Sequence, residues 1–158
     1  MKKRPFIRKA DINDVDAIFA LLEMYTSSGV VLSRSKEDIS LFIGNFVVAE
    51  IDGIVCGCAA VRFFGSDLQE IRSLVIDPEF QNQGVGRAII EYIIARVRKS
   101  PNKDWRLFAL TMTPEFFCKS GFKVVEKSLF PEKIWSDCSK CAKRDRCDET
   151  AVLMTEQD

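Results

Sequence analysis

Residues 70–87, EIRSLVIDPEFQNQGVGR, predict the fold of this chain. Residues 70–76 form a mostly apolar run typical of a β-strand, a turn with a proline follows, and a helix is expected to begin near Val85. Gly84 and Gly86 allow the backbone to approach a ligand closely, and the first N–H groups of a helix lack intrahelical partners and bind anions. With the fixed charge of Arg87, this layout predicts a cradle for phosphate groups.

The glycine spacing distinguishes three kinds of phosphate-binding loop. A P-loop requires Gly-x-x-x-x-Gly-Lys-Ser/Thr, and a dinucleotide-binding loop requires a third glycine where Ile89 stands. Residues 81–86 instead resemble the Gln/Arg-x-x-Gly-x-Gly/Ala signature of GNAT acetyltransferases, which holds the pyrophosphate of acetyl-coenzyme A (acetyl-CoA). A helix start with glycines but no ligand is the alternative. The resemblance implies that acetyl-CoA is contacted by Leu74, Val75, Ile76, Gln81, Asn82, Gln83, Gly84, Val85, Gly86 and Arg87.

Composition narrows the class of protein. A chain of 158 residues with 47% hydrophobic and 29% charged residues is predicted to form one domain over residues 1–158. The 23 basic and 23 acidic residues cancel, so nucleic acid and anionic membranes are not expected partners. The absence of histidine excludes Ser-His-Asp, Cys-His and histidine-metal sites. Neither a signal sequence nor an apolar run of membrane-spanning length is recognised, so a cytoplasmic protein is expected.

The order of hydrophobic patterns predicts a β-α-β-β-β-α-β-α-β-β chain. Asp11 or Asn13 is expected to cap the first helix, and Asp52-Gly53 to form the turn of a hairpin. A polar, cysteine-bearing insertion covers about residues 131–148. This order resembles a GNAT domain from end to end, which implies an α/β (α+β) fold with a mixed, mostly antiparallel sheet flanked by helices. Strands are expected near residues 4–8, 46–51, 54–63, 70–76, 106–111, 122–126 and 150–155.

A more specific resemblance covers nearly the whole chain. Residues 107–122, 30–35 and 70–76 are similar to bacterial N-acetylglutamate synthases, and the chain resembles their short type, with only the acetyltransferase domain. The amino-acid-kinase domain that carries arginine inhibition in longer members has no counterpart here. The resemblance implies transfer of acetyl from acetyl-CoA to the α-amine of L-glutamate, the first step of arginine biosynthesis. GNAT domains often pair through their last strands, which also implies a homodimer.

Acetyl transfer requires three groups: one that removes a proton from the ammonium, one that stabilises the oxyanion and one that protonates the thiolate. The resemblance places these roles on Glu70, on the backbone N–H of Val75 and on Thr111. Each residue has another reading. Glu70 can pair with Arg72, Val75 is an ordinary core residue, and Thr111 suits a strand end.

A glutamate acceptor requires cations that grip its two carboxylates. The resemblance assigns a substrate-carboxylate contact to Arg34 and a backbone contact to Ser73, and Arg72 and Lys133 are further candidates. Longer synthases carry Arg-Asn-Ser before the last strand, whereas residues 148–150 here are Asp-Glu-Thr. Loss of that arginine leaves L-glutamine or another small amine open as the acceptor. A non-catalytic, acetyl-CoA-binding regulatory module is the alternative from another class.

The six cysteines fall into two groups. Cys56, Cys58 and Cys118 are explained as buried small apolar residues. Cys138, Cys141 and Cys147 have a spacing found in zinc sites, but a fourth ligand is not evident, so structural zinc, a reducible disulfide and plain thiols all stay open.

Overall fold

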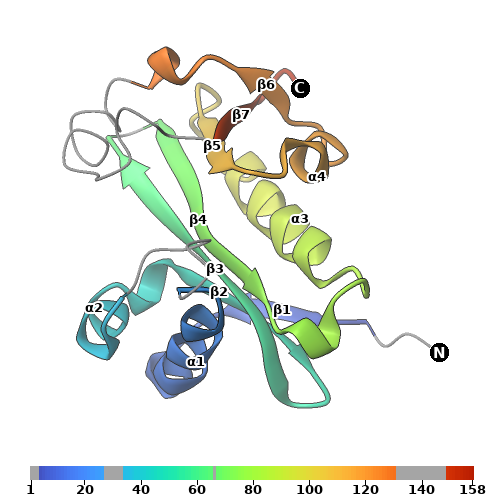
Figure 1. Ribbon diagram of the computed structural model, residues 1–158. Coiled ribbons are helices and arrows are strands. Elements are labelled where there is room, and N and C mark those ends of the chain that lie inside the picture. Colours follow the sequence, from blue (N-terminus) through green and yellow to red (C-terminus); the bar gives the residue numbers. More distant parts are fainter. Residues whose placement is uncertain (1–3, 27–33, 66, 131–148) are drawn as a thin grey trace. The chain divides into compact units, whose positions relative to one another are not determined.

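The computed structural model describes residues 4–26, 34–65, 67–130 and 149–158 (Figure 1). In this part of the chain, seven strands have the hydrogen-bonded order β1-β2-β3-β4-β5-β7-β6. The chain divides into two compact units, Met1–Val61 with Ile71–Lys99, and Arg62–Glu70 with Ser100–Asp158. No helix in the described ranges is long and apolar enough to cross a bilayer. The predicted insertion at residues 131–148 lies outside the described residues.

In the first unit, antiparallel strands form the sheet. β1 (Phe6–Lys9) pairs with β2 (Phe46–Ile51), which pairs with β3 (Ile54–Phe64). The β2–β3 turn is the predicted Asp52-Gly53 pair, with φ values of 55° and 79° that suit a tight hairpin. β4 (Leu68–Ile76) contributes its C-terminal part to this unit.

Helices cover both faces of this sheet. α1 (Val15–Thr26) and α2 (Lys36–Leu41) pack with alternate residues of β2, β3 and β4 in one hydrophobic cluster. α3 (Val85–Arg98) packs on the opposite face, because the side chains of Val85 and Ile89 meet Gly57 while its neighbour Cys58 belongs to the α1 cluster.

A buried carboxylate links β1 to the start of α1. Asp11 caps the short 3₁₀ helix η1 (Ile12–Asp14), and Asp14 completes a capping box. The side chain of Asp14 accepts hydrogen bonds from both Nη atoms of Arg8 at 2.8 and 2.9 Å, and Arg8 Nε donates to Glu50. These hydrogen bonds lower the pKa of Asp14 and outweigh its burial, which acts in the opposite direction.

We expect Asp14→Asn to lower the free energy of unfolding at pH 7 by about 2 kcal/mol, because charge-assisted hydrogen bonds are lost. The pKa of Asp14 is lower in the folded chain. Its stabilisation is therefore complete above the unfolded carboxyl pKa of about 4 and disappears as the pH falls towards the folded value. Urea denaturation between pH 7 and pH 3 measures this difference.

The acid-dependent part of the stability should be smaller in Asp14→Asn than in the wild type. Asp16→Asn is the matched control, because the Asp16 side chain is 85% exposed and pairs only at the surface with Lys36. Identical pH dependence in Asp14→Asn and the wild type would contradict the prediction.

The second unit has its own core. β5 (Arg106–Thr111) pairs in parallel with the start of β4 and antiparallel with β7 (Thr150–Thr155), and β7 pairs with β6 (Lys123–Val125). α4 (Pro114–Cys118) contacts β6 and β7. Phe108 stacks on Phe130 at a centroid distance of 4.1 Å. Both rings lie in a hydrophobic cluster with Phe64, Leu68 and Ala151.

The predicted mixed α/β architecture is confirmed, and the strands at residues 46–51, 106–111 and 150–155 have the expected bounds. α2 was not predicted, because it has six residues and only Ile39 is buried, too few for a helical repeat. The interpretation of Cys118 as a buried residue is wrong: its side chain is exposed beside the end of α4, whereas Cys56 and Cys58 are buried.

Candidate functional site

The predicted phosphate cradle connects β4 to α3 (Figure 1). Asp77 follows the last residue of β4, caps the 3₁₀ helix η3 (Pro78–Phe80) and accepts a hydrogen bond from Glu79 N–H at 2.9 Å. Asn82 and Gly84 then adopt left-handed φ values of 63° and 79°. Two left-handed residues within three positions turn the chain sharply into α3.

Gly84 is the N-cap of α3, with no side-chain cap on the helix. A Cβ added at Gly84 would meet nothing within 4 Å, so the left-handed φ and not crowding requires glycine here. The free N–H groups of a helix of this length and the open space beside Gly84 suit a bound anion. Arg87, the predicted cation, pairs at the surface with Glu91 at 3.0 Å.

The middle of β4 carries four predicted site residues. Glu70 belongs to the second unit, where it pairs with Phe108 of β5 and is 4% exposed. Arg72, Ser73 and Val75 belong to the first unit. Ser73 has a φ of 53°, which a non-glycine residue rarely adopts within a strand. This distortion could not be predicted from the sequence, because serine has no preference for left-handed backbone.

Three of the predicted residues in the first unit surround Cys58. The Sγ atom of Cys58 donates a weak hydrogen bond to the carbonyl of Ser73 at 3.7 Å. Burial raises the pKa of Cys58 to about 12, while the nearby charge of Arg34 and the backbone N–H of Val75 act in the opposite direction. The Cys58 thiol is therefore protonated and unreactive at neutral pH. Its surroundings bring together Arg34, Ser73 and the N–H of Val75.

Arg34 is held on two sides. Its Nε donates to Asp38 Oδ2 at 2.7 Å, and its guanidinium lies over the ring of Phe46 at 5.0 Å from the centroid. Ser35 caps α2 and so fixes Asp38 in its first turn. The pair with Asp38 uses Nε, so among the described contacts the two Nη groups of Arg34 are the ones available to a carboxylate.

Thr111 lies at the end of β5 in the second unit and is 9% exposed. Its hydroxyl oxygen accepts a hydrogen bond from Thr113 N–H at 2.9 Å and lies 3.2 Å from Thr113 Oγ1. Thr111 therefore shapes the entry into α4, a local role that the sequence did not reveal. An accepting hydroxyl still has its own proton to donate.

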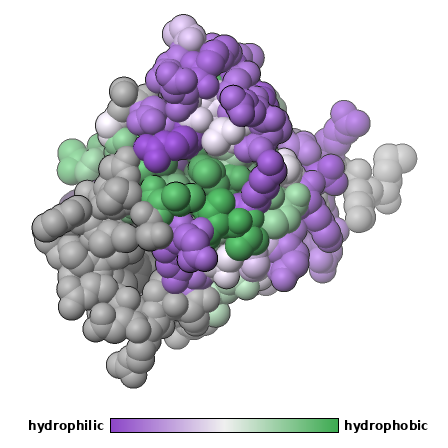
Figure 2. Space-filling model, turned by 90° about the horizontal axis from the view of Figure 1, so that it is seen from above, coloured by the Kyte–Doolittle hydropathy of each residue, from purple (hydrophilic) through white to green (hydrophobic). Residues whose placement is uncertain are grey.

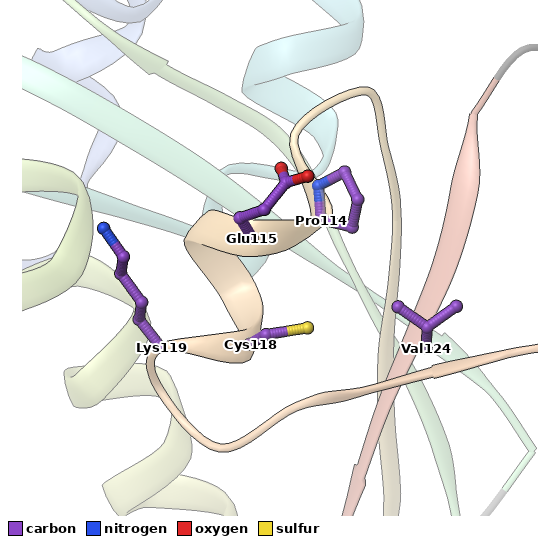
Figure 3. A pocket seen from close by; sticks show the side chains of 5 residues that line it. All are labelled: Pro114, Glu115, Cys118, Lys119 and Val124. Carbon is purple, nitrogen blue, oxygen red and sulfur yellow. The ribbon is translucent and has the colours of Figure 1, made fainter.

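An open pocket of the second unit is lined by Pro114, Glu115, Cys118, Lys119 and Val124 (Figure 3). The Sγ atom of Cys118 points towards Val124, while the ammonium of Lys119 extends away from both. In the part of the chain that the structure describes, none of the predicted site residues is among those that line this pocket. Seen from above, hydrophobic residues gather at the centre of the visible surface with hydrophilic residues around them (Figure 2).

The predictions for Lys133, Cys138, Cys141 and Cys147 lie outside the described residues. Within the described ranges, no group of three or more acidic or cysteine side chains is arranged to hold a metal ion.

Similarity to known proteins identifies the family of this chain. The model of the acetyltransferase (GNAT) domain matches residues 43–124, just over half of the chain. An uncharacterised N-acetyltransferase of Chlorobaculum tepidum is 41% identical over 94% of this chain and 95% of its own length. An amino-acid acetyltransferase of Mycobacterium tuberculosis is 34% identical over 78% of this chain and 71% of its own length.

Solved structures give the same family. N-acetylglutamate synthase from Neisseria gonorrhoeae, complexed with coenzyme A (CoA) and N-acetyl-glutamate, superposes with a TM-score of 0.83 and 29% identity. The match covers 98% of this chain and 36% of that chain. The chain likewise spans only 26–30% of several other curated amino-acid acetyltransferases.

These matches confirm the resemblance noted from the cradle sequence, the GNAT fold and the expectation of an acetyltransferase enzyme. The chain therefore belongs to the GNAT acetyltransferase family.

Proposed function

We propose that this chain transfers the acetyl group of acetyl-CoA to the α-amine of L-glutamate, giving N-acetylglutamate as in the first step of arginine biosynthesis. The main support is its similarity to the Neisseria gonorrhoeae synthase complexed with CoA and N-acetyl-glutamate. The 34% identity to the Mycobacterium tuberculosis amino-acid acetyltransferase supports an amino acid as acceptor.

The cradle binds acetyl-CoA in this proposal. The N–H groups of the loop and of the first turn of α3 bind the pyrophosphate, because they lack helical partners and the helix dipole favours negative charge there. The backbone of residues 74–76 contacts the remainder of the cofactor. The open space beside Gly84 supports this placement, since a ligand can approach the backbone without meeting a side chain.

The transfer itself is a direct attack within a ternary complex. Glu70, directly or through a water molecule, removes a proton from the acceptor ammonium, and the amine nitrogen then attacks the thioester carbon. The N–H of Val75 stabilises the resulting oxyanion. The nitrogen of the tetrahedral intermediate loses its second proton to solvent, the oxyanion collapses to the amide carbonyl and the C–S bond breaks. Thr111 gives a proton to the departing thiolate, and solvent restores the proton of Thr111. The low exposure of Glu70 and the donor capacity of Thr111 support these roles.

The acceptor carboxylates bind to cations of the first unit. Arg34 is the principal candidate, because Asp38 and Phe46 fix its guanidinium while its Nη groups stay available within the described contacts. Arg72 on β4 is the second, and Ser73 contributes its distorted backbone. A cationic acceptor such as a polyamine is disfavoured by the same charges.

L-Glutamine is the alternative acceptor. Residues 148–150 are Asp-Glu-Thr, whereas the longer synthases that this chain resembles carry Arg-Asn-Ser before the last strand. The side-chain carboxamide of glutamine is uncharged and does not require an arginine partner. The absence of arginine from this triplet therefore favours glutamine over a cationic amine as the alternative acceptor.

Release of CoA thiol from acetyl-CoA tests the acceptor, with glutamate, glutamine, aspartate, ornithine and spermidine compared. We expect kcat/KM for glutamate to exceed that for each other amine by at least about tenfold, because glutamine, ornithine and spermidine lack the side-chain carboxylate and that of aspartate is one methylene shorter. Preferred turnover of glutamine would replace glutamate as the acceptor in the proposal. Binding of acetyl-CoA with no turnover of any amine would instead support the regulatory module.

A further inference from the structure

The hydroxyl group of Tyr25, on α1, forms hydrogen bonds with both ends of the turn between β4 and the glycine signature, Ile76 and Gln81. The hydroxyl of Tyr25 donates to the carbonyl of Ile76 at 2.5 Å and accepts a hydrogen bond from Gln81 Nε2 at 3.0 Å. Gln81 Nε2 also lies 3.5 Å from the same carbonyl. Ile76 is the last residue of β4, and Gln81 is the first residue of the glycine signature.

The ring of Tyr25 is fixed by the core. Tyr25 is the penultimate residue of α1 and packs against the cluster that contains Ile18, Leu22 and Val75. Its position is therefore determined by a helix whose inner face is buried. The hydrogen bonds of the hydroxyl connect this buried helix to the loop of residues 77–84, which is largely exposed.

The bonds act where the cradle is least supported. Gly84 and Asn82 are left-handed, and Gln81 N–H reaches the carbonyl of Pro78 at a long 3.4 Å. The backbone N–H of Gln81 is thus weakly bonded, whereas Gly84 accepts a hydrogen bond of normal length, 3.0 Å, from Ala88 N–H at the start of α3. A side-chain bond from Gln81 to Tyr25, and a Tyr25 bond to the strand end, fix the start and the end of this turn relative to each other.

We propose that Tyr25 is a positioning residue for the cofactor cradle, which it holds through Ile76 and Gln81 in the arrangement that binds the CoA pyrophosphate. This inference rests on the proposed function, because it concerns how the acetyl-CoA site is preorganised. Tyr25 does not act on the reacting atoms. Its loss should therefore weaken cofactor binding without slowing the chemical step.

Tyr25→Phe keeps the ring in the core and removes only the hydroxyl. We expect the Kd for CoA, measured by calorimetry, and the KM for acetyl-CoA to rise about tenfold, which corresponds to the loss of one to two hydrogen bonds. At saturating acetyl-CoA, kcat should stay within about twofold of the wild type. The other tyrosine of the chain gives the matched control, since Tyr92 lies on α3 with Arg96 over its ring. Tyr92→Phe should leave both constants unchanged.

Gln81→Ala tests whether the two side chains act together. If Tyr25 acts through Gln81, the double variant should bind CoA about as weakly as Tyr25→Phe alone, so the losses are not additive. Thermal melting of each variant verifies that the fold is retained.

Three results would overturn the inference. Equal CoA affinity of Tyr25→Phe and the wild type would remove the positioning role, and a lower kcat with unchanged Kd would assign Tyr25 to the chemical step. Fully additive losses would separate it from Gln81. If the wild type itself does not bind CoA, the proposed function fails together with this inference, whereas the first three results leave the proposed function intact.

Discussion

Glu70→Gln should lower kcat by about 10²–10⁴-fold, the contribution usual for a general base. The substitution keeps the size and hydrogen-bonding shape of a side chain that is 4% exposed, but an amide cannot accept the proton of the acceptor ammonium. The Kd for CoA should be unchanged, because Glu70 is not one of the residues of the proposed phosphate cradle, residues 81–87. Stopped-flow or steady-state thiol release gives kcat, and calorimetry gives the Kd.

The pH dependence distinguishes a base from a structural carboxylate. As the pH approaches the pKa of the acceptor ammonium, the amine loses its proton to solvent, and the defect of Glu70→Gln should shrink. Glu115→Gln is the control, because Glu115 is an exposed glutamate of the same unit, outside the proposed machinery. Loss of stability with retained turnover in Glu70→Gln would show a structural role, such as the ion pair with Arg72 suggested by the sequence.

The strand–turn–helix layout of residues 70–87 was predictable because its signals are local. The proline of η3, the glycine at the N-cap of α3 and the apolar repeat of that helix each act through neighbouring residues. The hairpin turn at Asp52-Gly53 was predictable for the same reason, since left-handed φ angles are a property of those two residue types.

Contacts between distant residues were not predictable from one sequence. The helical repeat correctly placed Tyr25 on the apolar face of the first helix. The hydrogen-bond partners of its hydroxyl, however, are 51 and 56 residues away in the sequence. The distorted backbone at Ser73 likewise depends on how β4 is held by its neighbours. Arg34 was assigned a substrate contact through the family resemblance alone, and its partner Asp38 belongs to a helix too short to give a periodic signal.

Gly57 was also missed, because a glycine within a strand gives no sign of what approaches it. A Cβ at this position would lie 2.8 Å from Ile76 Cδ1, 3.1 Å from Val85 Cγ1 and 3.3 Å from Ile89 Cδ1. These distances are shorter than ordinary van der Waals contact, so a side chain at position 57 would force Ile76, Val85 or Ile89 to shift and would disturb the close packing of α3 on β3. Ile76 and Val85 flank the cradle, so the same close approach sets the position of its two sides.

Gly57→Val should lower the free energy of unfolding by about 3 kcal/mol through overpacking, and Gly57→Ala by about 1 kcal/mol. Displacement of Val85 should also weaken CoA binding by about tenfold in Gly57→Val. Urea denaturation and calorimetry measure the two effects. Gly44→Val is the matched control, because a Cβ at Gly44 meets nothing within 4 Å.

A second substitution tests the cause. Ile76→Val deletes the Cδ1 atom that lies nearest to the added Cβ. In the Ile76→Val background, Gly57→Ala should therefore lower the free energy of unfolding by at most half as much as it does in the wild type. Ile76→Val by itself costs about 1 kcal/mol through its cavity, which the new methyl group partly fills. Two results would show that the position of α3 does not depend on this contact. One is additive losses of unfolding free energy from Gly57→Ala and Ile76→Val, and the other is a Gly57→Val variant as stable as Gly44→Val. In that case the left-handed turn at Gly84 alone would have to fix the start of the helix.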